Sequence, residues 1–460
     1  MVAPQPILYM PMEIASRELD SRLLLATLAV ARGYEVVLGQ KWLIERNIER
    51  MPPGLYLSKT LTQRDGLTMA KAKSLGYLVA AIDEELPGLF MSSSQLRWMS
   101  QEAVDATDLL FVAGDGNSAA VAERFPTATS RIVQAANPRW DLLRADLRDI
   151  YADEVSELRR RYGRFILINT NLGFTNCEKG DVATIIRDQE RLGKLDLKNP
   201  DHAAYVQSII SMEEANRAAI EALLKELPSR FPNHRIILRP HPSEALEVWK
   251  KIGAEHPQIE VIREGPAVVW IMAADLLIHT NCTTGVEALA LDKPAICLMP
   301  SDSPANERYL SNRVNPIGRN VREALDLAAK VLQPNGHKFY TDDMLSLFRQ
   351  AMSYDQSKLG AETILNSISS RLAPISKPSV MTLWRPKTRY RWCIRDKNVR
   401  GILMPQLDEV AIRNKLATFA RLLHVKPPAY VSEAGSKVLL VSNSQLPLGT
   451  RCRRALGWLI

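Results

Sequence analysis

Two loops rich in polar side chains follow apolar runs in the middle of the chain. Arg235–Leu238 leads into Arg239-Pro240-His241-Pro242, and Asp275–His279 leads into a Thr-Asn-Cys-Thr-Thr-Gly loop at residues 280–285. The carboxyl ends of parallel strands meet at one edge of a sheet, so we expect these loops to face one site. The first brings a guanidinium and an imidazole. The second brings hydroxyls at a helix start, where free N–H groups favour an anion. The pair predicts a phosphate-binding site.

The two loops resemble the histidine-proline and serine/threonine motifs of bacterial CMP-sugar transferases, the sialyl- and Kdo transferases of the GT-B class. Over residues 7–370 the chain also resembles the bacterial surface carbohydrate biosynthesis protein family, with further matches at Ile7–Asp20, Asn137-Pro138-Arg139 and residues 169–174. The resemblance implies a glycosyltransferase that moves a sugar from a nucleotide donor to a cell-surface polysaccharide or lipid-linked glycan. A CMP-activated acidic sugar is the expected donor, on motif resemblance alone.

The order of apolar runs and helical stretches predicts an α/β protein. Ile7–Met10, Leu19–Ala31 and Tyr34–Gly39 form a strand-helix-strand start without a GxGxxG loop. With the resemblance, we expect a GT-B-like fold: two Rossmann-like domains with parallel sheets facing a central cleft, plus a C-terminal basic helical appendage. The expected divisions are residues 1–155 (acceptor side), 156–370 (nucleotide-sugar donor side, ending in crossover helices) and 371–460 (a basic extension containing aromatic residues).

Three helical regions bear on how the domains are connected. Leu142–Tyr162 is charged and helical and is expected to link the two halves. Residues 176–206 show little pattern and read as an insertion before a helix at Ile209–Leu227. The resemblance implies that a late helix crosses back onto the first domain. The candidates are Val321–Leu332, Met344–Met352 and Glu362–Leu372.

Most of the predicted site residues belong to the donor-side domain. His241 can donate a hydrogen bond or a charge to the donor phosphate, which makes that phosphate a better leaving group. Asn169-Thr170-Asn171 would line the nucleotide, or form only an Asx turn. By resemblance Glu287 would bind a ribose hydroxyl, or else it only complements the helix dipole. The predicted donor-binding residues are Asn169, Thr170, Asn171, Arg239, His241, Asn281, Thr283, Thr284, Gly285 and Glu287.

An acidic triplet ends an apolar run of the first domain. Glycosyl transfer needs a base for the acceptor hydroxyl proton, and a carboxylate at the cleft edge can serve. The resembling sialyltransferases have glycine directly after their acidic pair, whereas Gly88 here follows Leu86-Pro87, so the base stays open among three residues. A solvated acidic strand end is the other interpretation. The predicted catalytic residues are Asp83, Glu84, Glu85 and His241, and the acceptor-side candidates are Glu13 and Arg17, although Arg17 equally suits a helix-start ion pair.

Three other functions fit the same motifs. CDP-glycerol or CDP-polyol phosphotransferases share a similar loop pair, and UDP-sugar 2-epimerases share the loop with histidine and the two-domain cleft. The altered acidic motif also leaves open a non-catalytic scaffold that binds a nucleotide sugar or a glycan. For the leading function we expect no metal, since no DxD-type site is present, and no cofactor besides the nucleotide-sugar substrate.

Composition suits an ordinary globular protein, with 46% hydrophobic and 24% charged residues. Five scattered cysteines without a CxxC pair suit a reducing cytoplasm. Neither a signal peptide nor a spanning helix is predicted, so the expected location is the cytoplasm.

The formal net charge is +8, and much of the excess lies beyond residue 370. Basic and aromatic side chains alternate in Ser376–Arg400, and Arg451–Ile460 is also basic. No RNA-binding signature accompanies them, so we predict no nucleic-acid partner. A peripheral contact with the anionic inner face of the cytoplasmic membrane is favoured, against a basic face packed on the protein.

Overall fold

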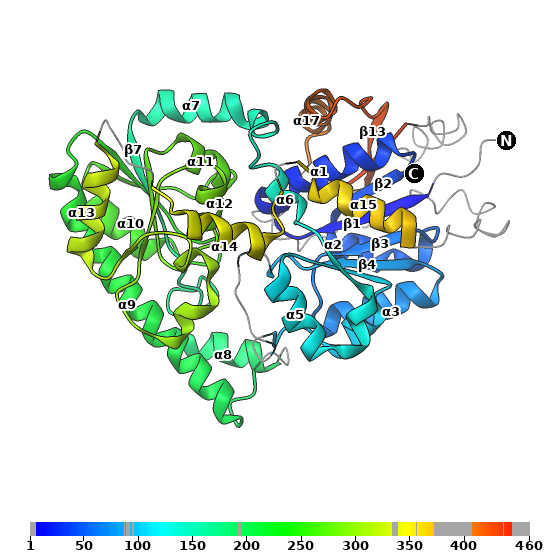
Figure 1. Cartoon of the computed structure of the whole chain (residues 1–460), viewed down its shortest axis with the longest axis horizontal. Helices are drawn as coiled ribbons and strands as arrows, with labels where there is room; N and C mark the ends of the chain where they lie inside the picture. Colours follow the sequence, from blue (N-terminus) through cyan, green and yellow to red (C-terminus); the bar gives the residue numbers. More distant parts are fainter. Residues whose placement is uncertain are drawn as a thin grey trace, which may run out of the picture.

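The computed structural model describes residues 6–86, 88, 93, 96–191, 195–333, 339–355, 357–371, 407–435 and 437–443. Two lobes, each built around its own sheet, lie side by side (Figure 1). The chain passes from the first lobe to the second through α7 (Ala152–Tyr162). It returns through α14 (Asp342–Met352) and α15 (Gly360–Arg371).

The first lobe is built on an eight-stranded sheet in the order β13-β14-β2-β1-β3-β4-β5-β6. The six strands from the N-terminal part run parallel. Their sequences are almost continuously apolar, because helices cover both faces of such a sheet. These strands are β1 Ile7–Met12, β2 Glu35–Gln40, β3 Leu55–Ser58, β4 Leu78–Ile82, β5 Leu109–Val112 and β6 Ile132–Gln134.

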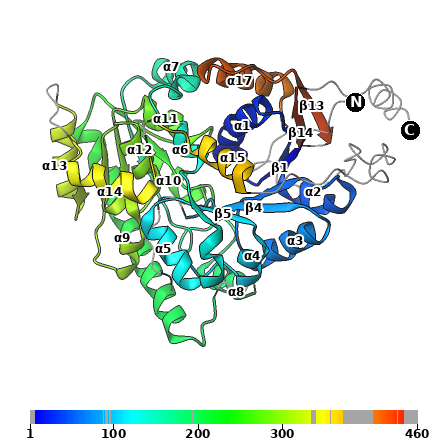
Figure 2. The same cartoon turned by 45° about the vertical axis from the view of Figure 1, so that its right-hand side comes forward.

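Helix α1 (Ala15–Ala31) is the most buried helix of this lobe. Its segment Leu23–Val30 has no exposed residue, because α6, α15 and α17 (Glu409–Leu422) pack over it (Figure 2). The other helices of the lobe are α2 Lys41–Arg46, α3 Gln63–Ser74, α4 Gln101–Ala106, α5 Asp115–Arg124 and α6 Pro138–Asp141, with 3₁₀ turns η1 Ile48–Arg50, η3 Pro126–Arg131 and η4 Arg148–Tyr151.

The second lobe is built on a six-stranded, fully parallel sheet in the order β12-β11-β10-β7-β8-β9. Its central strands are the apolar runs predicted from the sequence. The short edge strands β9 and β12 were not predicted. The strands are β7 Phe165–Asn169, β8 Arg235–Arg239, β9 Ile259–Val261, β10 Leu276–His279, β11 Ala295–Leu298 and β12 Ile317–Gly318.

Residues 176–206 are more regular than predicted. They contain α8 (Val182–Arg191) and the first turns of α9 (Pro200–Arg230), so the expectation of a patternless insertion was wrong. Val182, Ile185 and Ile186 are spaced as on one face of a helix, but this apolar stripe is only about one turn long and Ile185 is the one buried residue of α8. The remaining helices of this lobe are α10 Glu247–Ala254, α11 Ala267–Ala273, α12 Thr284–Ala290 and α13 Val321–Val331, with 3₁₀ turns η5 Pro304–Arg308 and η6 Leu310–Asn312.

The predicted link Leu142–Tyr162 becomes a regular helix only at Ala152, after the 3₁₀ turn η4. The return of late helices to the first lobe is confirmed: α14 packs on α5, and α15 packs on α1 and α6. The Asp141 carboxylate accepts hydrogen bonds from the amides of Gly360 (2.8 Å) and Ala361 (2.9 Å). A side chain of the first lobe therefore caps the start of α15.

The C-terminal extension is not only helical. Beside α17 it contains β13 (Tyr430–Gly435) and β14 (Val438–Ser442), and β14 pairs antiparallel with β2. The described part of the extension therefore completes the first sheet, which corrects the expected helical appendage. The basic segments 376–400 and 451–460 lie outside the described residues. None of the described helices is long and apolar enough to cross a membrane.

Candidate functional site

Three predicted loops start at one edge of the second sheet. In the strand register Asn169 of β7 lies between Arg239 of β8 and His279 of β10. These residues end three adjacent parallel strands, so the loops that follow them start side by side. The structure thus brings together the Asn169-Thr170-Asn171 loop, the loop of His241 and the loop at residues 280–285.

A buried carboxylate that the sequence did not reveal joins two of these loops. The Glu244 carboxylate accepts hydrogen bonds from the amide of His241 (3.1 Å), the hydroxyl of Thr170 (2.7 Å) and the amide of Leu172 (3.2 Å). The indole of Trp249 donates to its second oxygen (3.0 Å). The Thr170 hydroxyl is therefore engaged inside the protein, contrary to its expected place along the nucleotide. The one sequence feature that could have marked Glu244 is its position three residues after His241.

His241 is held as a neutral hydrogen-bond donor. Its Nδ1 accepts from the amide of Ser243 (3.2 Å), and the Ser243 hydroxyl lies 2.8 Å from the same nitrogen. An Nδ1 that accepts from an amide leaves the proton of the neutral ring on Nε2. Burial lowers the pKa of His241, and the nearby Glu244 carboxylate acts against that change. At neutral pH the ring therefore offers an Nε2–H donor rather than a positive charge.

The amides of Asn281 and Asn171 hold loops together. Asn281 adopts a left-handed backbone conformation (φ 48°), and its side chain contacts Met212 Sδ (2.9 Å) and accepts from Asn312 (2.7 Å). Asn171 donates to the Asn281 carbonyl (2.9 Å). Both amides were predicted to bind the donor, and in the structure both bind the protein.

The start of α12 lies over polar atoms that lack partners. Among the described residues, no hydrogen-bond partner reaches either ring nitrogen of the fully buried His279, Oδ1 of Asn169 or Oγ1 of Thr280. Burial lowers the pKa of His279 to about 3, so this ring is neutral. A Cβ at Gly285 would lie 2.2 Å from Nε2 of His279. Glycine is therefore required there for the helix to sit close over the ring.

Thr283 lies at the boundary between the lobes. It is partly exposed and directly precedes α12, and Thr284 is the first, buried residue of that helix. A Cβ on Gly88 of the first lobe, where φ is 85°, would lie 3.0 Å from Cγ2 of Thr283. The predicted hydroxyl-rich helix start therefore faces the other lobe closely.

Arg239 is anchored away from the strand ends. It donates to the carbonyls of Glu264 (2.9 Å) and Gly265. Its Nε is buried without a partner. Burial lowers the pKa of Arg239 to about 10, and the opposing effect comes from Glu287. Both hydrogen bonds come from Nη2 and fix the loop after β9, so they use two of the five N–H donors of the guanidinium.

Two of the three acidic residues after β4 are structural. Asp83 accepts from the amides of Glu85 (2.8 Å) and Leu86 (3.3 Å) and from the indole of Trp98 (3.1 Å). Burial raises the pKa of Asp83 to about 6. The Asp83 carboxylate therefore stabilises the turn at residues 83–86 from its first position.

Glu84 is buried and paired. Its two oxygens bind Arg22 (3.0 Å) and the Asn137 amide (3.0 Å). Burial acts to raise the pKa of Glu84, but the guanidinium groups of Arg22 and Arg139 hold it below its usual value. A carboxylate with both oxygens committed to internal partners cannot receive a substrate proton without breaking them.

Glu85 is the member of the triplet that faces solvent, with 54% of its side chain exposed. It forms an ion pair with Arg17 (3.2 Å), which also donates to the Glu84 carbonyl. The Arg17 guanidinium lowers the pKa of Glu85, so this carboxylate is ionised at neutral pH. Arg17 therefore forms the helix-start ion pair that was one of its two expected roles.

Glu13, the other acceptor-side candidate, lies next to a buried lysine. Lys59 Nζ binds the carboxylates of Glu13 (2.9 Å) and Glu18 (2.8 Å). Burial acts to raise the pKa of Glu13, but Lys59 holds it below its usual value. The Glu13 side chain remains 35% exposed, so it is an ionised carboxylate that solvent can reach.

Charged groups of the two lobes face one another. Arg139 of the first lobe lies 3.8 Å from Glu287 of the second. The charges of Arg17 and Glu85 both act on the pKa of His241. Burial raises the pKa of Glu287, whereas Arg139 and Arg17 act to lower it. Arg139 was not among the predicted site residues, although the Asn137-Pro138-Arg139 match had marked its position.

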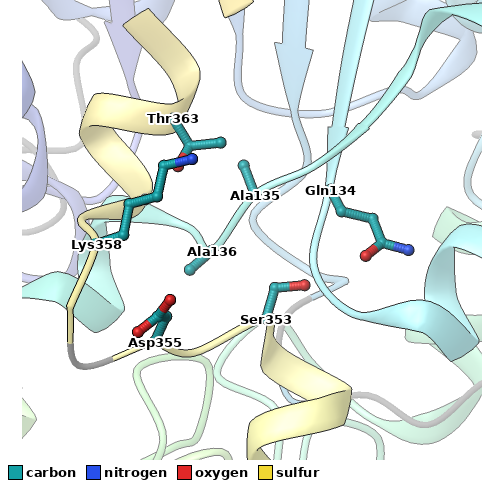
Figure 3. Close-up of a pocket in the computed structure, with 8 residues that line it drawn as sticks. Gln134, Ala135, Ala136, Ser353, Asp355, Lys358 and Thr363 are labelled. Carbon is teal, nitrogen blue, oxygen red and sulfur yellow. The ribbon is translucent and has the colours of Figure 1, made fainter. Parts of the chain in front are cut away.

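A separate pocket of about 200 Å³, open to solvent, lies where the chain returns to the first lobe (Figure 3). Gln134 and Ala135 line it on the side of β6, and Ser353, Asp355 and Lys358 line it on the side of the crossover. It shares no residue with the predicted site.

Comparisons with known proteins address the fold. Neither a protein-family model nor a curated protein matches the sequence. The solved structure of a putative UDP-N-acetylglucosamine 2-epimerase from Listeria monocytogenes matches with a TM-score of 0.50 and 11% identity, over 80% of this chain and 96% of that one. The wall teichoic acid polymerase TagF matches with a TM-score of 0.50 and 12% identity, over 81% and 91%.

The chain has the GT-B fold. At such identities the likeness establishes the architecture, and activity has to be argued from the residues of the cleft.

Proposed function

We propose that this protein is a glycosyltransferase that uses a nucleotide-sugar donor. One observation carries the proposal: the segment after the acidic triplet lies against the start of α12, where a Cβ on Gly88 would lie 3.0 Å from Thr283 Cγ2. The two lobes thus bring an exposed carboxylate (Glu85) and a neutral imidazole (His241) to neighbouring loops. Transfer of a sugar needs a base toward the acceptor and a hydrogen-bond donor toward the departing phosphate.

In this proposal Glu85 receives the proton of the acceptor hydroxyl. The hydroxyl oxygen forms the new bond to the anomeric carbon of the sugar, and the bond from that carbon to the phosphate oxygen breaks. His241 Nε2–H and the amides at the start of α12 stabilise the negative charge left on the phosphate. The reaction needs no cofactor, and the expectation that it needs no metal belongs to the same proposal.

The donor we propose is a CMP-activated acidic sugar, which rests on the sequence motifs. A second candidate function is that of a UDP-sugar 2-epimerase or of a polymerase that uses a CDP-polyol, because the two solved structures named above share this fold. The acceptor we propose is a surface polysaccharide or a lipid-linked glycan.

The experiment that tests the proposal is nucleotide release from a panel of CMP-, CDP- and UDP-linked donors, with and without EDTA. Acceptor-dependent release of one nucleotide, unchanged by EDTA, supports a metal-independent transferase. Release of UDP without acceptor favours the epimerase. A Thr283→Ala, Thr284→Ala double variant should bind the preferred nucleotide more weakly, and unchanged binding contradicts the phosphate site.

A further inference from the structure

Two arginines from different lobes pack on one tyrosine ring. Tyr205 lies in the second turn of α9. The guanidinium carbon of Arg97, in the first-lobe segment after β4, lies 4.3 Å from the ring centroid. That of Arg308, at the end of η5, lies 5.3 Å from the same centroid. Both contacts are within the range of cation–π attraction.

Both arginines are half-buried, and each has one buried nitrogen that lacks a hydrogen-bond partner among the described residues. Among the described residues, no carboxylate lies within ion-pair distance of Arg97 or Arg308. Nη1 of Arg97 and Nε of Arg308 are buried without a hydrogen-bond partner. Burial lowers the pKa of Arg97, the charge of Arg308 lowers it further, and the Asp201 carboxylate acts against that change. Two like charges with unused N–H donors thus lie against one ring, an arrangement that an anion would stabilise.

The floor of this cluster is apolar and aromatic. Phe174, Tyr205 and Tyr309 are partly buried and pack on Ile209, Met212 and Ala305. The buried Glu213 carboxylate accepts a hydrogen bond from the amide of Phe174 (2.9 Å), which holds the backbone beside these aromatic side chains. Met212 also contacts Asn281, so the cluster adjoins the predicted donor loops. Partly buried rings beside cationic donors suit a sugar ring that carries a negative charge.

We propose that Arg97, Arg308 and Tyr205 bind an anionic group, a phosphodiester or a carboxylate, on a glycan chain. That this glycan is the acceptor rests on the proposed glycosyltransferase function. The geometry of the anion site does not depend on that function, because Arg97, Arg308 and Tyr205 have no role in the proposed transfer step. A guanidinium fork binds carboxylate and phosphate oxygens alike, so the two sources of charge are separated by experiment.

The test uses calorimetric titration of the full chain at low salt with three hexamers of matched length: a glycerol phosphate oligomer, a galacturonate oligomer and neutral maltohexaose. At least one charged hexamer should bind and maltohexaose should not. Arg97→Gln and Arg308→Gln should each weaken binding of the charged hexamer about tenfold or more. The exposed Arg322 of α13 provides the matched control, and Arg322→Gln should bind as the wild type does.

The preferred hexamer identifies the charged group. Charged hexamers that bind both glutamine variants within about twofold of the wild type, or maltohexaose binding as tightly, overturn the site. Arg97→Lys keeps the charge but not the fork, and it replaces Arg97→Gln if the latter fails to fold. A purely structural clamp would lower the unfolding temperature without changing hexamer affinity, and that result also overturns the site. The titration contains no nucleotide donor, so it tests the anion site alone. Hexamer binding together with no nucleotide release from any donor of the panel would keep the anion site and reject the glycosyltransferase function.

Discussion

At the scale of single residues, three neighbouring carboxylates have different surroundings and different roles. Asp83, Glu84 and Glu85 are equivalent in the sequence, which left the base open among them. In the structure Asp83 closes a turn, Glu84 neutralises buried Arg22, and Glu85 faces solvent. Sequence could not separate them because the direction of each side chain depends on a turn that Trp98 and Arg22 complete from elsewhere in the chain.

The first prediction concerns the base. Glu85→Gln should lose most transfer activity while its denaturation midpoint stays near that of the wild type, because an exposed surface ion pair contributes only about 0–1 kcal/mol. Glu84→Gln should instead destabilise the fold by about 3 kcal/mol, because it leaves buried Arg22 without its charged partner. Transfer rates and urea denaturation of both variants check this. Full activity in Glu85→Gln would move the base to Glu13.

The second prediction concerns the leaving group. His241→Ala should lower turnover at least about tenfold, because it removes one hydrogen bond to the developing charge on the phosphate. The fold should remain intact, since the backbone amide of residue 241, which the substitution keeps, still donates to Glu244. His256→Ala, remote from the cleft loops, is the matched control. Equal turnover of the two variants would remove His241 from the mechanism.

At the scale of elements, the central strands and the loops after them could be predicted, because apolar runs and turn residues are local signals. Strands β9 and β12 are only three and two residues long, too short for a pattern, and the apolar stripe of α8 (Val182, Ile185, Ile186) spans only about one turn. The network around Glu244 was not predictable, since its partners lie as far as 74 positions away.

The third prediction concerns this network. Glu244→Gln places an amide NH₂ against buried donors, so we expect a loss of about 1–3 kcal/mol in unfolding free energy. The loops of Asn169 and His241 would lose their common anchor, so nucleotide affinity and turnover should fall together, unlike in His241→Ala. The exposed Glu247→Gln is the control. Wild-type nucleotide affinity in Glu244→Gln would show that the loops hold their geometry without this carboxylate.

At the scale of the whole molecule, a buried carboxylate fixes the returning helix α15 on the first lobe. Asp141 of the first lobe accepts from two amides of α15. Burial raises the pKa of Asp141 to about 7, against the effect of those hydrogen bonds and of Arg144. A folded pKa above the unfolded value of 3.8 stabilises the fold at low pH, and this contribution is lost as pH rises through 7.

The fourth prediction follows from that sign. The unfolding free energy of the wild type minus that of Asp141→Asn should be larger at pH 5 than at pH 8, by about 2 kcal/mol. Urea denaturation at both pH values measures it, with the exposed Asp153→Asn as control. An equal difference at the two pH values would mean that Asp141 is ionised in the folded protein throughout this range.

The last prediction concerns the basic segment 376–400. Each basic residue near an anionic leaflet contributes about 1 kcal/mol, so we expect salt-sensitive binding to anionic liposomes in flotation. Removing everything after Ser370 is not a usable test, because α17 packs on α1 and β14 pairs with β2. Replacing Arg385, Lys387, Arg389 and Arg391 by Gln leaves those elements in place and should abolish flotation. Replacing four exposed arginines elsewhere (Arg187, Arg191, Arg230 and Arg322) by Gln removes the same charge and should not. Equal flotation of the two variants, or none by the wild type at low salt, would contradict a membrane role for the segment.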